Sequence, residues 1–386
     1  EMGTLHEWAA TYPLFHWGPI PWGFYLVLSA AFGFMLHVRK RTRQKYSEAC
    51  RPVLGNKVDG IAGKLIDLIA VFALLAGTAT TFSLATPLLA GAISSVTGIP
   101  QSTGLTLVIL VIVCAIYTFS VYFGMKGVQL SAATCTWLFF GLLAYVFFFG
   151  GQTRFIIEEG ITALGNLTQN FIGLATWTDS LRTSSFPQTW TIFYWAYWMV
   201  WCVAVPFFIG SISKGRTLRQ VILGGYVFGL SGTFTSFIIM GNYGLGLQMH
   251  GKLDVLSSYA ADGNLYHAIL DILGQLPLSK AVLVLLVLCM ITFYSTSFDS
   301  ITMVASTYTY KKLQSDEEPH RNVKLFWAIF LILLPLALIF SENSMSNLQT
   351  VSIIAAFPVG IIMLLIISSF FKDADAYLKE QANPPE

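Results

Sequence analysis

The segment WTIFYWAYWMVW, residues 190–201, carries seven aromatic side chains in twelve positions. On a helix of about 3.6 residues per turn, five of them share one face, along a stripe about 16 Å long. These five are Trp190, Tyr194, Tyr197, Trp198 and Trp201. Aromatic ring faces bind a cation that cannot be hydrogen-bonded, such as a quaternary ammonium, with about 0.5–2 kcal/mol from each ring. The stripe therefore predicts a cation cage.

Two structural explanations of the stripe stay open. Trp and Tyr gather at membrane interfaces, although such a belt belongs at helix ends and this stripe continues well into the segment. The rings could instead pack against a neighbouring helix, where small residues are usually preferred.

A second aromatic group lies in LFHWGPIPWGFYLVL, residues 14–28. Trp22 and Tyr25 are three residues apart and share a helix face, and Pro21 suits the first turn of a helix. Together with Trp17, they would supply further rings for the cage. Taken singly, the same residues are typical interface anchors.

Oxygen ligands for a cation occur in ITFYSTSFDSITM, residues 291–303. Thr296 and Ser297 supply hydroxyls, which the carbonyl oxygen of Phe293 could join in a sodium site. The alternative is that the hydroxyls bond back to the preceding helical turn. Asp299 is a charge at membrane depth, for which a functional role is the default hypothesis, and local capping or pairing is the alternative.

The elements that must position these residues are transmembrane helices. The chain has 386 residues, of which 55% are hydrophobic and 11% charged, whereas soluble domains carry about 25% charged residues. Apolar runs of about 20 residues, long enough to cross a bilayer, recur along it. The net charge of +2 gives no nucleic-acid footprint, and the five cysteines show no C-x-x-C pair, so we expect buried small residues.

The apolar runs predict an all-α integral membrane protein with nine spans. They lie at roughly 19–38, 65–90, 104–125, 129–150, 187–211, 219–242, 279–310, 323–341 and 349–371, with ends uncertain by about 2–4 residues. Basic residues collect in cytoplasmic loops. Here they follow the first, fifth and seventh spans, which predicts an external N-terminus and a cytoplasmic C-terminus. A helix along the outer membrane surface is expected within residues 151–186, because its apolar positions have helical spacing.

Several motifs resemble the betaine/carnitine/choline transporter (BCCT) family. The family signature Trp-Thr-x-x-Tyr-Trp-x-Trp-Trp is matched by WTIFYWAYW, with Tyr197 as the departure from Trp. The further matches, in family order, are FHWGPIPW, GKLIDLIAVFALLAGTA, ISKGRTLRQ, FYSTSFDS and SNLQTVSIIAAFP. They cover essentially the whole chain.

The resemblance implies a LeuT-like fold of two inverted five-helix repeats and a homotrimer in the bacterial inner membrane. The chain would contain spans four to twelve of a twelve-span family, and so be N-terminally truncated. Residues 1–150 would hold the last four helices of the first repeat, and residues 187–371 the second repeat. Residues 372–386 would form a short cytoplasmic tail.

The resemblance also implies a role for each aromatic residue. The substrate cage would consist of Trp17, Trp22, Tyr25, Tyr197, Trp198 and Trp201, with Trp190 and Tyr194 on the path to it. The substrate would be a quaternary ammonium solute such as glycine betaine, carnitine or choline. The expected activity is secondary active uptake, and an inactive remnant or a sensor is the alternative of another class. No nucleophile–base arrangement or phosphate-binding glycine loop suggests an enzyme.

For the coupling ion, the resemblance gives a mixed result. Sodium-coupled members form one sodium site at the position of Phe293, Thr296 and Ser297. At their second site Thr78 matches a ligand, but Leu74 and Ala204 replace a hydroxyl and an aromatic ring. Sodium-independent carnitine exchangers use a membrane Arg, and residues 129–150 contain no Arg or Lys. We expect Na⁺ as the coupling ion, with substrate exchange or proton coupling as the alternatives.

Overall fold

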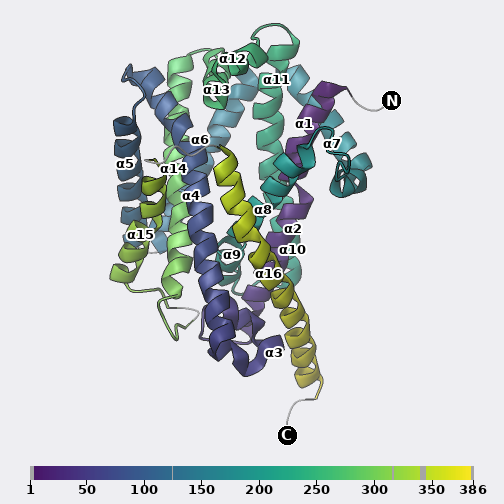
Figure 1. Ribbon diagram of the computed structural model, residues 1–386, viewed down its shortest axis with the longest axis vertical. Coiled ribbons are helices and arrows are strands. Elements are labelled where there is room, and N and C mark those ends of the chain that lie inside the picture. The colour runs from purple at the N-terminus through teal and green to yellow at the C-terminus, as the bar shows by residue number, and fades with distance from the viewer. Residues whose placement is uncertain (1–3, 124, 315–316, 340–344, 384–386) are drawn as a thin grey trace. The chain divides into compact units, whose positions relative to one another are not determined.

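The computed structural model describes residues 4–123, 125–314, 317–339 and 345–383. Over these residues the regular structure is helical, without a strand (Figure 1). The all-α expectation is therefore confirmed. The end of the predicted eighth span, residues 340–341, and the last three residues of the tail lie outside the described part.

The α-helices follow one another along the whole chain. In order, they are α1 (Leu5–His16), α2 (Pro19–Gly33), α3 (Arg51–Leu54), α4 (Ile61–Thr97), α5 (Thr103–Tyr122), α6 (Met125–Phe149), α7 (Thr153–Thr176), α8 (Ile192–Trp201), α9 (Val205–Ile212), α10 (Leu218–Ser236), α11 (Asn242–Met249), α12 (Val255–Asp262), α13 (Leu265–Gly274), α14 (Ser279–Thr307), α15 (Arg321–Ile339) and α16 (Met345–Ala382).

Short turns of other helix types extend or join these α-helices. The 3₁₀ turns are η2 (Tyr46–Cys50) and η3 (Gly55–Asp59), and the π-helical turns are η1 (Phe34–Val38), η4 (Pro187–Thr191) and η5 (Phe237–Gly241). Trp190 therefore lies on a π turn that leads into α8.

Seven helical segments of the described chain are long and apolar enough to cross a membrane, and a bent pair makes eight. Each of these eight overlaps one predicted span. The predicted span at 323–341 coincides with α15, so a helix stands at every predicted position. The first differs most, because the apolar segment already begins at Leu5 and continues to Val38.

The bent pair is formed by residues 187–201 and 205–212, which meet at an angle of 44°. Pro206 lies in the first turn of α9, where a missing N–H is tolerated, but inside one continuous helix its ring would clash with the preceding turn. The predicted span at 187–211 is therefore a broken helix, and α8 ends directly after the aromatic segment.

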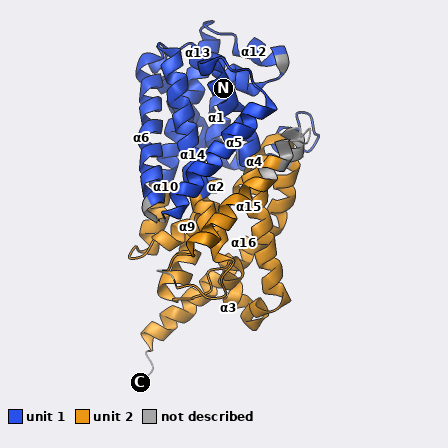
Figure 2. Ribbon diagram, turned by 90° about the vertical axis from the view of Figure 1, so that its left-hand side faces the viewer, with its two compact units in different colours: residues 1–20, 81–187, 228–298 blue, residues 21–80, 188–227, 299–386 orange. Residues whose placement is uncertain are grey.

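The chain divides into two compact units, coloured separately in Figure 2. The first consists of residues 1–20, 81–187 and 228–298, and the second of residues 21–80, 188–227 and 299–386. The units interleave along the sequence, whereas each expected repeat is one continuous stretch, and the repeats stay a prediction.

Each unit has its own packing. In the first, α1 packs against α7, and a buried cluster that includes Leu142, Ile156, Tyr243 and Leu286 joins α6, α7, α11 and α14. In the second, α8 packs along α16. In that unit α9 also lies close to α2, because a Cβ atom added at Gly210 would be 2.8 Å from the backbone nitrogen of Gly33.

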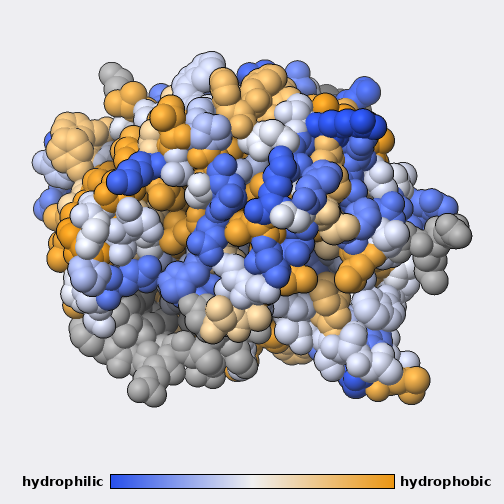
Figure 3. Space-filling model, turned by 90° about the horizontal axis from the view of Figure 1, so that it is seen from above, coloured by the Kyte–Doolittle hydropathy of each residue, from blue (hydrophilic) through white to orange (hydrophobic). Residues whose placement is uncertain are grey.

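Large apolar side chains are exposed along several helices, including Phe72, Val111, Phe119 and Phe148. Lipid is the solvent that such surfaces need. The end that carries α11, α12 and α13 differs, because hydrophilic and hydrophobic side chains are mixed there (Figure 3).

Candidate cation-binding site

Three rings from α2 and α8 form a tight aromatic cluster in the second unit. The ring centroid of Trp198 lies 4.6 Å from that of Tyr25 and 5.7 Å from that of Trp22, and the latter two are 6.0 Å apart. Both pairs that involve Trp22 are edge-to-face. Trp22 and Tyr25 face α8 together because they are one helical turn apart, as the sequence predicts.

Edge-to-face geometry matters for cation binding. Aromatic pairs prefer it because the positive edge of one ring meets the negative face of the other. The ring that presents its edge keeps both of its faces available, and a cation binds over such a face within about 6 Å of the centroid. Trp22, Tyr25 and Trp198 thus have the ring chemistry that a cation cage needs, in a cluster where Tyr25 and Trp198 are buried.

The remaining rings of the stripe pair along α8. Tyr197 and Trp201 form an edge-to-face pair with centroids 6.4 Å apart, and Trp190 stacks on Tyr194 at 5.9 Å. The Trp201 indole lies against α4, because a Cβ atom added at Gly77 would be 3.4 Å from two atoms of that ring, which is close contact. Trp201 thus contacts α4, whereas Trp198 contacts α2.

Trp17 is the predicted cage residue that belongs to the other unit. It directly follows α1 and belongs to the first unit, where its ring centroid lies 5.8 Å from that of Phe237. The other five predicted cage residues belong to the second unit.

The predicted sodium ligands lie in the first unit, on a part of α14 that is helical throughout. The Thr296 hydroxyl donates to the carbonyl oxygens of Thr292 and Phe293, both at 3.1 Å. This is the back-bonding that the sequence left as an alternative. A hydroxyl that donates its proton keeps oxygen lone pairs for a cation, so the residues remain chemically suited to sodium and the site stays a prediction.

Two further predicted residues belong to the second unit and are fully buried. Asp299 is 0% exposed on α14. Thr78, also buried, follows Gly77 on α4 and donates its hydroxyl to the Leu74 carbonyl oxygen at 2.7 Å. Ala204 replaces the aromatic ring that sodium-coupled family members are expected to have at their second sodium site. It is buried in the break between α8 and α9.

The sequence reading missed an ion-pair network in the segment after the first span. Arg51 donates to Glu48 at 2.7 Å and to Asp59 at 2.8 Å, and Arg43 donates to Asp59 at 2.8 Å. By their positions alone, the basic residues of this segment predict only the orientation of the chain. The acidic residues placed among them were the signal that the segment folds on itself.

Other metal chemistry has no support in the described residues. No group of three or more His, Cys, Asp or Glu side chains is placed there to hold a metal ion. The five cysteines are free, and all but Cys114 are buried.

Comparison with known proteins shows which transporters this chain resembles. The family model described as betaine/carnitine/choline family transporter matches residues 2–379. A carnitine transporter of Acinetobacter baumannii is 28% identical over 367 residues, which are 95% of this chain and 66% of that protein. The uncharacterized transporter YeaV of Escherichia coli K12 is 27% identical over 95% of this chain and 76% of its own length. The chain thus spans about two thirds to three quarters of these relatives.

Proposed function

Because this chain belongs to the betaine/carnitine/choline transporter family, we propose that it carries a quaternary ammonium solute across the bacterial inner membrane by secondary active transport. The membership makes it a multi-pass membrane transporter and not an enzyme. The observation that carries the proposed substrate class is the cluster of Trp22, Tyr25 and Trp198, whose centroids lie within 6.0 Å of one another.

The chemistry of the cluster selects among cations. Rings without a carboxylate favour a methylated ammonium, which is weakly hydrated, over a metal ion or a primary amine. Glycine betaine, carnitine and choline all carry this group. The name of the Acinetobacter relative makes carnitine the first compound to test.

The proposed cage extends beyond this cluster. Tyr197 and Trp201 lie next along α8, and the family motifs imply Trp17 as a further cage residue. Trp190 and Tyr194 line the path to the cage. Stacking of these two rings at 5.9 Å supports a continuous aromatic path toward Trp198.

For energy coupling we propose sodium symport. The carbonyl oxygen of Phe293 and the hydroxyls of Thr296 and Ser297 are the ligands, and Thr78 marks a weaker second site. Residues 129–149 of α6 contain no Lys or Arg, which argues against an exchanger that replaces sodium by a basic side chain. The assembly proposed is a homotrimer of LeuT-like protomers, with the repeats at 1–150 and 187–371 and a cytoplasmic tail.

Uptake into liposomes tests this proposal. Purified protein would be offered labelled carnitine, glycine betaine and choline, each with and without an inward sodium gradient. Saturable uptake of one solute that depends on the gradient is the expected result. Uptake that needs a related compound inside the liposomes, whatever the sodium gradient, would show exchange instead. No uptake of any methylated ammonium would contradict the proposed substrate class.

A further inference from the structure

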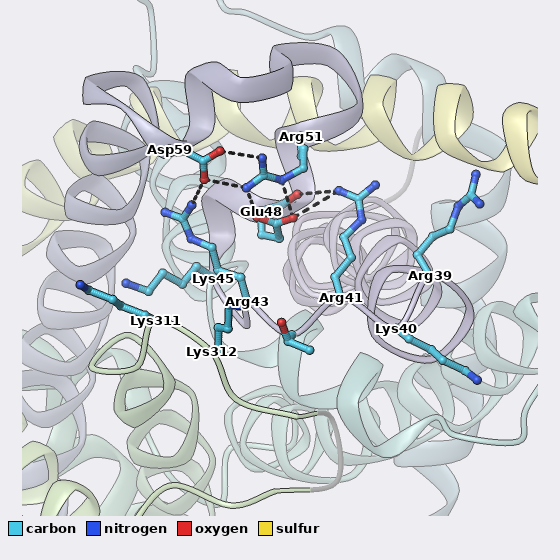
Figure 4. Close-up of a pocket in the computed structure, with 11 residues that line it drawn as sticks. Arg39, Lys40, Arg41, Arg43, Lys45, Glu48, Arg51, Asp59, Lys311 and Lys312 are labelled. Carbon is cyan, nitrogen blue, oxygen red and sulfur yellow. Dashed lines mark hydrogen bonds and ion pairs between the residues drawn. The ribbon is translucent and has the colours of Figure 1, made fainter.

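A cavity of about 640 Å³ lies in the second unit, and none of its lining residues belongs to the aromatic cluster (Figure 4). Its lining is strongly basic, with eight Lys or Arg side chains and two carboxylates. The lining residues are Arg39, Lys40, Arg41, Thr42, Arg43, Lys45, Glu48, Arg51, Asp59, Lys311 and Lys312. None of them is aromatic. The cavity is large enough for a small-molecule ligand, for which about 300–1,000 Å³ is typical.

The two lining carboxylates are already engaged by arginines. Glu48 accepts hydrogen bonds at 2.7 and 2.8 Å from Arg51, and lies 3.5 Å from an Arg41 nitrogen. Asp59 accepts from Arg51 and Arg43, as the dashed lines of Figure 4 show. These charge-assisted bonds hold the arginine side chains in fixed positions. Both carboxylates of the lining are therefore paired with arginines, and the lining keeps a net positive charge.

The lysines of the lining are less engaged than its arginines. Lys40, Lys45, Lys311 and Lys312 form no ion pair with a residue that the structure describes, and Figure 4 draws no dashed line to them. Burial lowers the pKa of Lys45, with the nearby Arg43 charge adding to the effect and Asp67 opposing it. An anion next to this ammonium would favour its charged form.

Hydrogen bonds to backbone carbonyl oxygens hold the two lysine-bearing segments together. The Leu313 N–H donates to the Thr42 carbonyl oxygen at 2.7 Å, and the side-chain amide of Gln44 donates to the carbonyl oxygens of Leu313 and Gln314. The Thr307 hydroxyl donates to the Gln44 carbonyl oxygen at 2.9 Å. The backbone that carries Lys311 and Lys312 is thus held beside the segment of Arg43 and Lys45 before any ligand binds.

We propose that this cavity binds a phosphate group. A phosphate offers several charged acceptor oxygens to many donors at once, which suits a lining of lysines and arginines. No aromatic ring lines the cavity, and the charged donors of its lysines and arginines match the oxygens of a phosphate, so the phosphate itself is the recognised part. The cavity follows the first span, in loops that the sequence predicts to be cytoplasmic. Basic clusters at that position bind anionic lipid headgroups, and a soluble phosphate is the other source.

Thermal unfolding of the purified protein in detergent tests the site, with two probes that separate the sources. One is short-chain phosphatidylglycerol, compared with short-chain phosphatidylcholine, and the other is inorganic phosphate, compared with chloride at equal ionic strength. The test variant is Lys45→Gln/Lys311→Gln/Lys312→Gln. The matched control is Lys214→Gln/Arg216→Gln/Arg219→Gln, which removes the same charge from another predicted cytoplasmic loop.

As the concentration of the bound probe increases, the melting temperature of the wild type and of the control should rise and then level off. In the test variant the half-saturating concentration should increase at least about tenfold. A response to phosphatidylglycerol alone identifies a lipid headgroup, and a response to inorganic phosphate identifies a soluble ligand. The proposal is overturned if neither probe stabilises the wild type, or if the test variant and the control respond alike.

Discussion

At the scale of single residues, Trp198 is the centre of the aromatic cluster. It is only 6% exposed, and its ring contacts both Tyr25 and Trp22. Tyr197 departs from the family signature, but it contacts Trp201 and Phe193 on its own helix. Trp198 and Tyr197 are neighbours in the same aromatic motif, but Trp198 contacts rings of α2 and Tyr197 contacts rings of its own helix.

Replacing Trp198 by Leu should raise the apparent KM for a quaternary ammonium solute at least about tenfold, because a ring face contributes about 0.5–2 kcal/mol and more when desolvated. Trp198→Phe should retain part of the affinity. Trp137→Leu is the control, since Trp137 is 80% exposed on α6, and its uptake kinetics should stay unchanged. Equal kinetics for Trp198→Leu and the wild type would remove the cage from the mechanism.

Removing the Thr296 or Ser297 hydroxyl should raise the sodium concentration for half-maximal uptake about tenfold, because a bond from oxygen to a charged group contributes about 1.5–3 kcal/mol. Thr292→Ala is the matched control. Its hydroxyl also bonds back to α14 carbonyl oxygens, those of Leu288 and Cys289. If Thr296→Ala and Thr292→Ala have the same sodium dependence, the Thr296 hydroxyl has a structural role only.

At the scale of elements, close helix packing supports the side chains of the site. Within the second unit, a Cβ atom at Gly210 of α9 would lie 2.8 Å from the Gly33 nitrogen, 2.9 Å from the Phe32 Cβ atom and 3.1 Å from the Ser29 carbonyl oxygen. None of these atoms can rotate away. Glycine at position 210 therefore sets the distance between α9 and α2, the helix that carries Trp22 and Tyr25.

Gly210→Ala should destabilise the protein by about 1–3 kcal/mol, the usual cost of overpacking. Gly224→Ala is the control, because a Cβ atom there meets nothing within 4 Å and alanine favours a helix. Melting temperatures of the two purified variants give the comparison. Equal stability would mean that α9 and α2 can separate without loss.

The loop after α7 depends on one carboxylate. Asp179 accepts hydrogen bonds from the backbone N–H groups of Thr183, Ser184 and Ser185 at 2.8–3.1 Å, and from two hydroxyls. The Ser184 N–H bond is the largest of the effects that lower the pKa of Asp179 below its ordinary value of 3.8. Bonds to the charged form stabilise the loop, which holds Asp179, Arg182 and Ser185 at positive φ.

Because this pKa is lowered on folding, the stabilisation is fully present above about pH 4 and is lost only as the pH falls through the folded-state value. Hydrogen exchange of loop amides, corrected for the intrinsic pH dependence, should therefore show constant protection from pH 7 to about pH 4. Asp179→Ala should lose the protection at every pH. A wild-type loss centred near pH 6 would contradict the assignment to this carboxylate.

At the scale of the whole molecule, the basic residues predict which loops face the cytoplasm. Leu181 lies in a segment expected outside, Lys311 lies in one expected inside, and both are exposed. In a Cys114→Ser background, a membrane-impermeant maleimide should label Leu181→Cys in intact cells. It should label Lys311→Cys only after permeabilisation. The reverse pattern would invert the proposed topology and move the basic cavity to the outer side.

The sequence by itself determined the membrane class, the positions of the helices and the aromatic side chains that share a face. Composition and helical periodicity suffice for these, because they depend on local geometry and on transfer from water to lipid. Only the tertiary structure decided that Trp198 meets Trp22 and Tyr25, that Trp201 lies against Gly77, and that Trp17 packs on Phe237. Helix rotation and separation are set by packing between residues distant in sequence, such as Gly210 and Gly33, and no local pattern records that packing.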